Sequence, residues 1–208
     1  MCRLYLAGSV TNGLHPKTIH RLFMRAAQPR GTATAFAEKR AQLRTLCATG
    51  SLPFSLAELD TYLAKYEADG CPSVHHSDVY RDAYAPAYRL ILAEAAPYLS
   101  LLAAIDTALA QQERVCVAVD GRCGSGKSTF ASLARALYAQ DCTILHMDDF
   151  FLPLELRTAE RFAQPGGNVH WERVLAEVLQ PLAAGKAPEY GVFDCSVMAV
   201  NRTVREEI

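Results

Sequence analysis

Apolar and polar residues repeat with a helical period over much of the first half of the chain. Apolar side chains recur three or four positions apart in residues 16–27, 34–49 and 56–68, which predicts three amphipathic helices. Ser55 followed by Glu58 is a capping-box pattern, so we expect the third helix to begin there. Residues 1–86 are thus predicted to form a mostly α-helical N-terminal domain, with residues 3–8 either a lone strand or a buried segment.

A further apolar stripe, at Leu101, Leu102, Ile105 and Leu109, predicts a helix over residues 97–112. It lies within a connecting segment, residues 87–113. No run of about 20 uncharged apolar residues is present, so we expect no transmembrane helix and no membrane partner. The N-terminus has no pattern of a secretory signal.

Residues 74–89 combine histidines, tyrosines and charges. His75, His76 and Asp78 include residue types that ligate metals, but sequence supplies no second shell of supporting groups. The favoured interpretation is that Tyr80, Tyr84 and Tyr88 dock this segment on the helices and leave their polar tips in solvent.

The pattern changes after residue 114. Residues 115–119 are a short run rich in β-branched side chains, which is typical of a strand buried on both faces of a parallel sheet. A helix over residues 128–139 and a second strand over residues 143–147 are predicted to follow. This order predicts an α/β fold, a parallel sheet with flanking helices.

Residues 121–128 read Gly-Arg-Cys-Gly-Ser-Gly-Lys-Ser, which matches the P-loop pattern G-x-x-x-x-G-K-[ST]. Glycines let backbone N–H groups approach phosphate oxygens, and the helix that follows directs free N–H groups at them. Lys127 is predicted to contact the β- and γ-phosphates of ATP, and Ser128 to ligate Mg²⁺. The expected nucleotide-binding residues are Gly121, Cys123, Gly124, Ser125, Gly126, Lys127, Ser128 and Thr129.

Asp148 and Asp149 follow the second predicted strand. In open α/β sheets ligands bind at the carboxyl ends of strands, so these carboxylates are candidates for chemistry. One is predicted to accept a proton from a substrate hydroxyl, and Asp149 to hold Mg²⁺ directly or through water. The alternative is an Asp pair that forms a turn.

Four segments, residues 120–129, 147–151, 166–172 and 190–195, resemble the uridine kinase and phosphoribulokinase-like P-loop kinases, and most of all bacterial proteins labelled uridine kinase-like. The resemblance spans residues 115–199 and implies that residues 114–208 are the N-terminal portion of a P-loop kinase domain, a partial P-loop NTPase fold. Because the family continues into another core strand and a lid, the resemblance also predicts that the chain is truncated.

The resemblance implies roles for individual residues. Asp148 falls at the catalytic aspartate, and the stretch that includes Asn168 and His170 falls where the family contacts the acceptor. Phe193 and Asp194 fall on the segment that lines the acceptor pocket. Phe193 replaces the tyrosine of true uridine kinases, so we do not expect uridine specificity. Arg157, in the long loop before Asn168, is a further candidate for substrate binding.

Composition narrows the function classes. The formal net charge of −1 gives no bulk electrostatic reason to expect a nucleic-acid partner. Seven cysteines without a zinc-like pair indicate a reducing, cytoplasmic compartment.

These observations favour an ATP-dependent kinase that phosphorylates a hydroxyl of a nucleoside- or sugar-like metabolite, with Lys127 and Asp148 as catalytic residues. The alternatives are a regulatory module in which ATP binding controls docking of the helical N-terminal domain, and an NTPase that drives conformational work.

Overall fold

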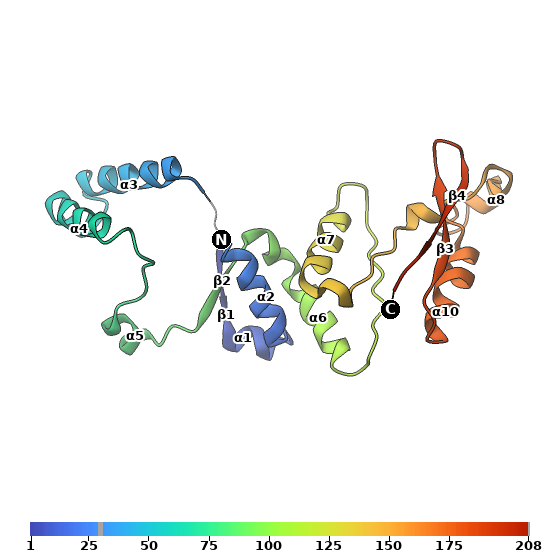
Figure 1. The fold of residues 1–208 in the computed structure, drawn as a ribbon, viewed down its shortest axis with the longest axis horizontal. Coiled ribbons are helices and arrows are strands. Elements are labelled where there is room, and N and C mark those ends of the chain that lie inside the picture. Colours follow the sequence, from blue (N-terminus) through green and yellow to red (C-terminus); the bar gives the residue numbers. More distant parts are fainter. Residues whose placement is uncertain (29–30, 208) are drawn as a thin grey trace. The chain divides into compact units, whose positions relative to one another are not determined.

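The computed structural model describes residues 1–28 and 31–207 and divides into two compact units, Met1–Thr107 and Ala108–Ile208. Each unit has its own elements and its own buried side chains. Figure 1 follows the elements along the chain.

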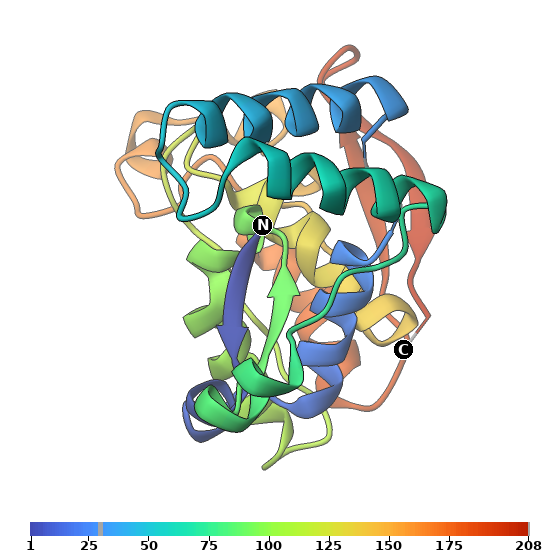
Figure 2. The same cartoon turned by 90° about the vertical axis from the view of Figure 1, so that its left-hand side faces the viewer.

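The first unit contains a small antiparallel sheet. Strand β1 (Cys2–Tyr5) pairs with β2 (Tyr88–Ile91), and the register runs from Cys2 opposite Ile91 to Tyr5 opposite Tyr88 (Figure 2). Residues 3–8 were expected to form a lone strand or a buried segment. Residues 3–5 instead belong to β1, whose partner strand lies more than eighty residues later in the chain, and residues 6–8 are helical.

Helices α1 (Leu6–Thr11), α2 (Pro16–Ala26) and α6 (Leu99–Leu109) accompany this sheet, and the short helix η1 (Ala93–Tyr98) precedes α6. Asp106 of α6 is buried and ties α2 in place, because its carboxylate accepts hydrogen bonds from the His15 N–H at 2.8 Å and the Thr18 hydroxyl at 2.9 Å. Buried apolar side chains of this region are Leu4, Leu14, Ile19, Leu22, Ile91 and Leu102.

Helices α3 (Ala33–Ala48) and α4 (Leu56–Ala68) form an antiparallel hairpin around Cys47, Leu59 and Leu63. The predicted capping box is confirmed: Ser55 Oγ accepts from the Glu58 N–H at 3.3 Å, and Glu58 Oε2 accepts from the Ser55 N–H at 2.8 Å. The predictions for residues 16–27, 34–49 and 56–68 are confirmed to within one residue at each end. The short helix α5 (Asp78–Tyr84) follows α4.

The second unit begins at Ala108, within the last turn of α6. A long segment without helix or strand then leads to α7 (Lys127–Tyr138), the predicted helix after the glycine-rich loop. Short turns of helix follow: η2 (Ala139–Asp141), η3 (Met147–Phe150), η4 (Leu154–Leu156) and α8 (Ala159–Phe162). Next come α9 (Trp171–Arg173), the π-helical stretch η5 (Val174–Leu179) and α10 (Gln180–Ala183). The unit ends with β3 (Glu189–Asp194) and β4 (Ala199–Arg205), and its core is Phe150, Val178, Tyr190 and Val192.

The prediction of a parallel sheet of the P-loop NTPase type is wrong. Residues 115–119 and 143–147 form no strand, and Val117 and Val119 remain 40% exposed. Among the described residues, both sheets are antiparallel pairs of strands. The strand that does form in this unit around Val192 is β3, which makes a hairpin with β4.

Chain connectivity gives a physical reason for this outcome. A parallel pair needs a crossover of a dozen or more residues, whereas a hairpin closes through a short turn at low entropic cost. Here the turn is fixed by the Asp194 carboxylate, which accepts from the Ser196 N–H at 2.8 Å and from the Asn201 side-chain amide at 2.6 Å. Residues 115–119 and 143–147 are rich in β-branched side chains, which favour strands, but neither run has a partner strand as close in sequence as β4 is to β3.

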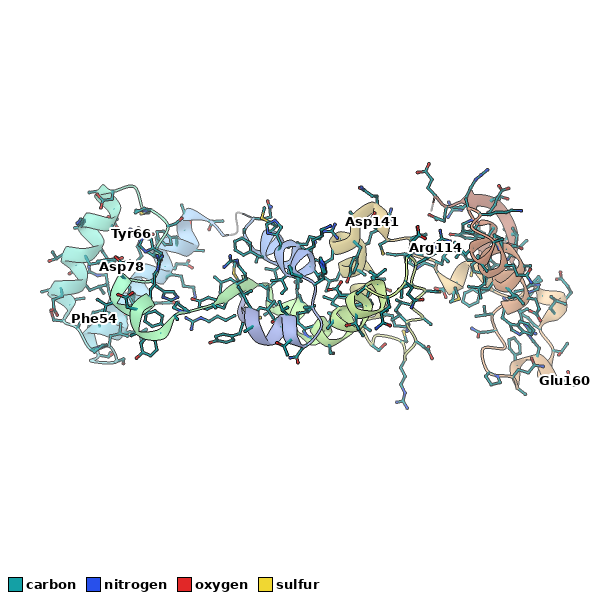
Figure 3. All side chains as sticks on the ribbon, turned by 90° about the horizontal axis from the view of Figure 1, so that it is seen from below. Phe54, Tyr66, Asp78, Arg114, Asp141 and Glu160 are labelled. Atoms are coloured by element: carbon teal, nitrogen blue, oxygen red, sulfur yellow. The ribbon has the colours of Figure 1, made fainter. Side chains whose placement is uncertain are left out.

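The segment before the glycine-rich loop is tied to the unit by a side chain. Arg114, which is labelled in Figure 3, donates from Nη1 to the Leu182 carbonyl, at the end of α10, over 3.0 Å. Within the described residues, every helix is too short or too polar to cross a bilayer.

Candidate nucleotide site

The glycine-rich loop, residues 121–126, leads directly into α7. Gly124 has φ +74° and Gly126, the residue before the helix, has φ +91°. Residues other than glycine rarely adopt this left-handed backbone conformation. The first backbone bond of the helix runs from the Phe130 N–H to the Gly126 carbonyl at 2.9 Å. The local sequence thus explains both the bend and the point at which the helix starts.

The backbone N–H groups of Lys127, Ser128 and Thr129 have no hydrogen-bond acceptor among the described residues. They are the free donors of the first helical turn, where the helix dipole also favours negative charge. A phosphate group would provide acceptors for all three. This is the feature that the motif predicts, and α7, with 12 residues, is long enough to support it.

The Lys127 side chain folds back over the loop. Its ammonium donates to the carbonyls of Gly121 at 2.6 Å and Arg122 at 3.0 Å. Asp120 holds the other side of the bend, since its carboxylate accepts from the Gly121 N–H at 2.7 Å. The ammonium is therefore placed over the loop, and it must exchange carbonyl partners for phosphate oxygens if it is to bind a nucleotide.

The acidic pair lies on η3, just before the buried Phe150. Asp148 is exposed and Asp149 is half-buried. Burial is the main cause that raises the pKa of Tyr190 to about 12, and the negative charges of Glu206 and Asp149 add to it. Asp149 therefore lies within electrostatic range of the hairpin core, whereas Asp148 faces solvent.

Two of the predicted acceptor residues lie beside the acidic pair. Phe151 and Val169 form an antiparallel bridge, the His170 N–H donates to the Phe150 carbonyl at 2.6 Å, and the Leu152 N–H donates to the Asn168 carbonyl at 3.2 Å. Asn168 and His170 are thus brought next to the chain that carries Asp148, although they are twenty or more residues away in sequence.

Phe193 and Arg157 join the same group. The Phe193 ring meets the Phe151 ring edge-on at 6.3 Å, and the Arg157 guanidinium lies 6.0 Å from the Phe193 centroid. Arg157 Nε also donates to the Leu152 carbonyl at 2.8 Å. The four predicted acceptor residues Arg157, Asn168, His170 and Phe193 therefore come together around residues 150–152.

Asp194 has a different role. Its carboxylate accepts from Ser196 and Asn201 in the turn between β3 and β4, and these hydrogen bonds, those of Ser196 first, lower its pKa. Its oxygens are occupied by these hydrogen bonds, which stabilise the hairpin, so Asp194 is not free to bind a phosphoryl acceptor.

Two ion-pair networks were not anticipated from sequence. Arg161 forms a two-pronged ion pair with Glu172, at 2.6 and 2.7 Å, and His170 Nδ1 lies 3.1 Å from Glu172 Oε2. The Arg161 hydrogen bonds are the main cause that lowers the pKa of Glu172 to about 2. The eleven-residue spacing of Arg161 and Glu172 carries no local signal.

The second network joins a helix to the hairpin. Arg173 and Glu177 are four residues apart, a spacing that sequence could have flagged, and they pair at 2.7 and 2.8 Å. Arg173 also donates to the Gly191 carbonyl at 2.5 Å, while Glu177 accepts from the Gly191 N–H at 3.0 Å.

The loop and the acidic pair are not joined. Within residues 108–207, no hydrogen bond or ion pair connects residues 121–128 to Asp148 or Asp149, and no group of three or more His, Cys, Asp or Glu side chains is placed to hold a metal ion.

No family model matches the chain, and neither a curated protein nor a solved structure matches it. The functional conclusion therefore depends on the chain's own residues.

Proposed function

We propose that residues 121–129 bind the polyphosphate of ATP and that the chain is a phosphotransferase acting on a hydroxyl of a small metabolite. The observation that carries the proposal is the row of free backbone donors at Lys127, Ser128 and Thr129, which follows a loop whose carbonyls the Lys127 ammonium contacts. An ordinary turn at the start of a helix has no need of a lysine folded over its glycines.

In the proposed reaction the acceptor oxygen attacks the γ-phosphorus of ATP. The bond from that phosphorus to the β,γ-bridging oxygen breaks, ADP leaves, and the acceptor proton passes to the Asp148 carboxylate. Asp148 suits this role because it is exposed and makes no ion pair among the described residues. The group of Arg157, Asn168, His170 and Phe193 beside it would bind the acceptor.

The transfer requires Mg²⁺ in this class of chemistry, and few protein ligands are needed, since Mg²⁺ keeps several waters and phosphate oxygens. The exposed Ser128 hydroxyl, in the first turn of α7, fits as one ligand. Asp149 would contribute through water. When bound, the ion would neutralise charge on the transferred phosphoryl group.

A loss-of-charge variant tests the nucleotide site. Lys127→Ala is expected to weaken ATP–Mg²⁺ binding by roughly tenfold or more, because it removes a charged donor to the phosphates. Binding is measured by titration calorimetry and by the ATP-dependent shift of the melting temperature. Lys186→Ala, which removes an exposed lysine of the same unit, should bind ATP like the wild type. Equal ATP binding in Lys127→Ala and the wild type would refute the site.

A second candidate is a regulatory nucleotide-binding module. The observation in its favour is that no interaction within the described residues connects the loop to Asp148.

Asp148→Asn separates the two candidates. For a kinase it should keep ATP affinity and lower phosphotransfer by about a hundredfold or more, because the proton acceptor is gone. The measurement is ADP release with a panel of nucleosides and sugar-like alcohols. Asp141→Asn, another exposed aspartate of this unit, is the matched control (Figure 3). Unchanged turnover in Asp148→Asn would remove Asp148 from the chemistry.

A further inference from the structure

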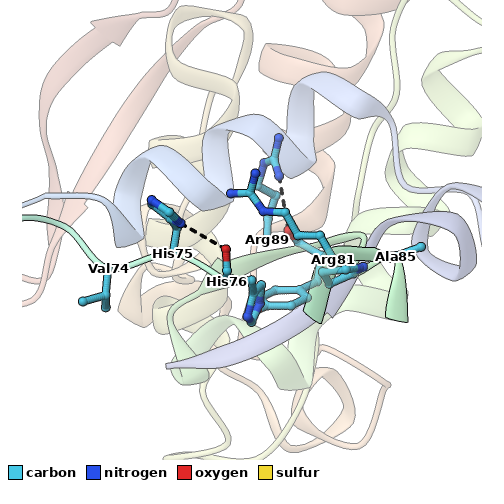
Figure 4. Close-up of a pocket in the computed structure, with 8 residues that line it drawn as sticks. Val74, His75, His76, Arg81, Ala85 and Arg89 are labelled. Atoms are coloured by element: carbon cyan, nitrogen blue, oxygen red, sulfur yellow. Dashed lines mark hydrogen bonds between the residues drawn. The ribbon is translucent and has the colours of Figure 1, made fainter. Parts of the chain in front are cut away.

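The first unit contains a hollow of about 520 Å³ between the segment before α5, the end of α5 and the start of β2 (Figure 4). This volume is within the range of sites for small organic ligands. The residues that line it are Val74, His75, His76, Arg81, Ala85, Pro86, Tyr88 and Arg89. Half of these side chains carry or can accept a positive charge, and none is acidic.

The two arginines lack carboxylate partners. No ion pair involves Arg81 or Arg89 within the described part of the chain. Arg89 donates instead to the Tyr88 carbonyl at 3.2 Å and lies 5.6 Å from the Phe23 ring centroid. Figure 4 shows both guanidinium groups extending in the same direction. Both arginines are exposed, and a bound anion would give each guanidinium a charged acceptor.

The wall of the hollow is held by aromatic contacts. His76 Nε2 and the Tyr88 hydroxyl are 2.6 Å apart, and the His76 ring stacks on Tyr80 at 4.4 Å. Tyr80 in turn contacts Tyr84 at 4.8 Å, and the Arg3 guanidinium lies 4.8 Å from the Tyr88 centroid. These contacts fix Tyr88 and His76 in place before any ligand arrives, which lowers the entropic cost of binding.

We propose that this hollow binds a small phosphorylated metabolite, with the phosphate group between Arg81 and Arg89 and the organic part against Val74, Ala85 and Pro86. Guanidinium groups bind phosphate through paired N–H donors, and His75 adds a further polar group at the rim. Of the remaining groups on the same elements, Asp78 and Asp82 of α5 are acidic but do not line the hollow. This site is independent of the nucleotide site proposed above.

The test uses the full chain and three probes: inorganic phosphate, glycerol 3-phosphate and ribose 5-phosphate. Calorimetric titration at low salt is expected to show saturable binding of the phosphate esters, weakened by added salt because the contacts are ionic. Tighter binding of the esters than of inorganic phosphate identifies a metabolite site; equal binding identifies a site for the free anion and overturns the assignment of the organic part.

Arg81→Gln and Arg89→Gln should each weaken binding by about tenfold or more, since each removes a charged hydrogen-bond donor. Lys65→Gln removes one charge of the same unit outside the hollow and should bind normally. Circular dichroism confirms that each variant is folded. Lys127→Ala should leave binding unchanged, which separates this site from the ATP site. No saturable binding by the wild type, or equal losses in all three charge variants of this unit, would overturn the proposal.

Discussion

Charged residues of the second unit act mainly through neighbours that are distant in sequence. Arg161 meets Glu172, Arg173 meets Gly191, and Asp194 meets Asn201. Each of these contacts fixes a loop or a strand instead of facing open solvent. The type of a single residue therefore does not show which partner its side chain meets in the fold: the Asp194 carboxylate accepts hydrogen bonds from Ser196 and Asn201.

The low pKa of Glu172 predicts an acid-sensitive contact. Its value of about 2, against an ordinary value of 4.5, is caused first by the Arg161 hydrogen bonds. A carboxylate with a depressed pKa in the folded state contributes stability that is full above about 4.5 and is lost as the pH falls toward 2. Because the Glu172 side chain is partly exposed, solvent screens the ion pair, and we expect the effect to be modest.

Glu172→Gln tests this prediction. The variant should be less stable than the wild type at pH 7, and the difference should shrink as the pH is lowered from 4.5 to 2. Urea unfolding followed by the fluorescence of Trp171, the single tryptophan, reports on this site. A difference that stays constant down to pH 2 would contradict it. Glu155→Gln, an exposed acid that makes no ion pair within the described residues, is the control.

At the scale of elements, the helices follow local signals. Helix α4 begins and ends where its apolar period and the Ser55–Glu58 cap predict. The strands do not, since β1 depends on β2 and β3 depends on β4 for every backbone bond of the sheet. Helices, whose backbone hydrogen bonds lie within one segment, are thus easier to predict from sequence than strands, which need a partner strand.

Ser55→Ala is expected to destabilise α4 by about 1 kcal/mol, because the N–H of Glu58 loses its acceptor. The measurement is hydrogen exchange of peptides over residues 56–68, which should become faster. Thr61→Ala removes an exposed hydroxyl from the middle of the same helix, where its partner is the Ala57 carbonyl, and should not accelerate exchange. Similar exchange in the Ser55 variant and the wild type would show that the cap contributes nothing.

For the whole molecule, the two units have separate cores. Leu102 is fully buried in the first and Val178 in the second. We expect a cavity in one core to lower the stability of that unit and to leave the stability of the other unit unchanged. Leu102→Ala should destabilise the first unit by about 3 kcal/mol, seen as an earlier loss of far-ultraviolet dichroism in urea.

The transition of Trp171, which belongs to the second unit, should keep its midpoint in Leu102→Ala. Val178→Ala, the matched variant, should shift that transition instead. A common shift of both signals in either variant would mean that the chain unfolds as one cooperative body.

The sequence allowed much of the helical structure and the loop of residues 121–128 to be predicted, because glycine, lysine and capping residues act on their own backbone. It failed for the sheet, because 115–119 and 143–147 show β-branched residues but cannot show what they pair with. The structure groups residues 150–152 with Asn168, His170 and Phe193, and this contact between separate segments has no local signal in the sequence. The arginines of the hollow were passed over, since charge clustering there depends on the fold.

The Lys127 ammonium, bonded to the carbonyls of Gly121 and Arg122, has a consequence for selectivity. An incoming anion must displace these two carbonyl oxygens before it can contact the ammonium. A lone phosphate or a chloride ion offers too few contacts to offset that loss, whereas a long polyphosphate can engage the amides and the ammonium together. The hydrogen bonds between the Lys127 ammonium and its own loop would thereby exclude short anions from the site.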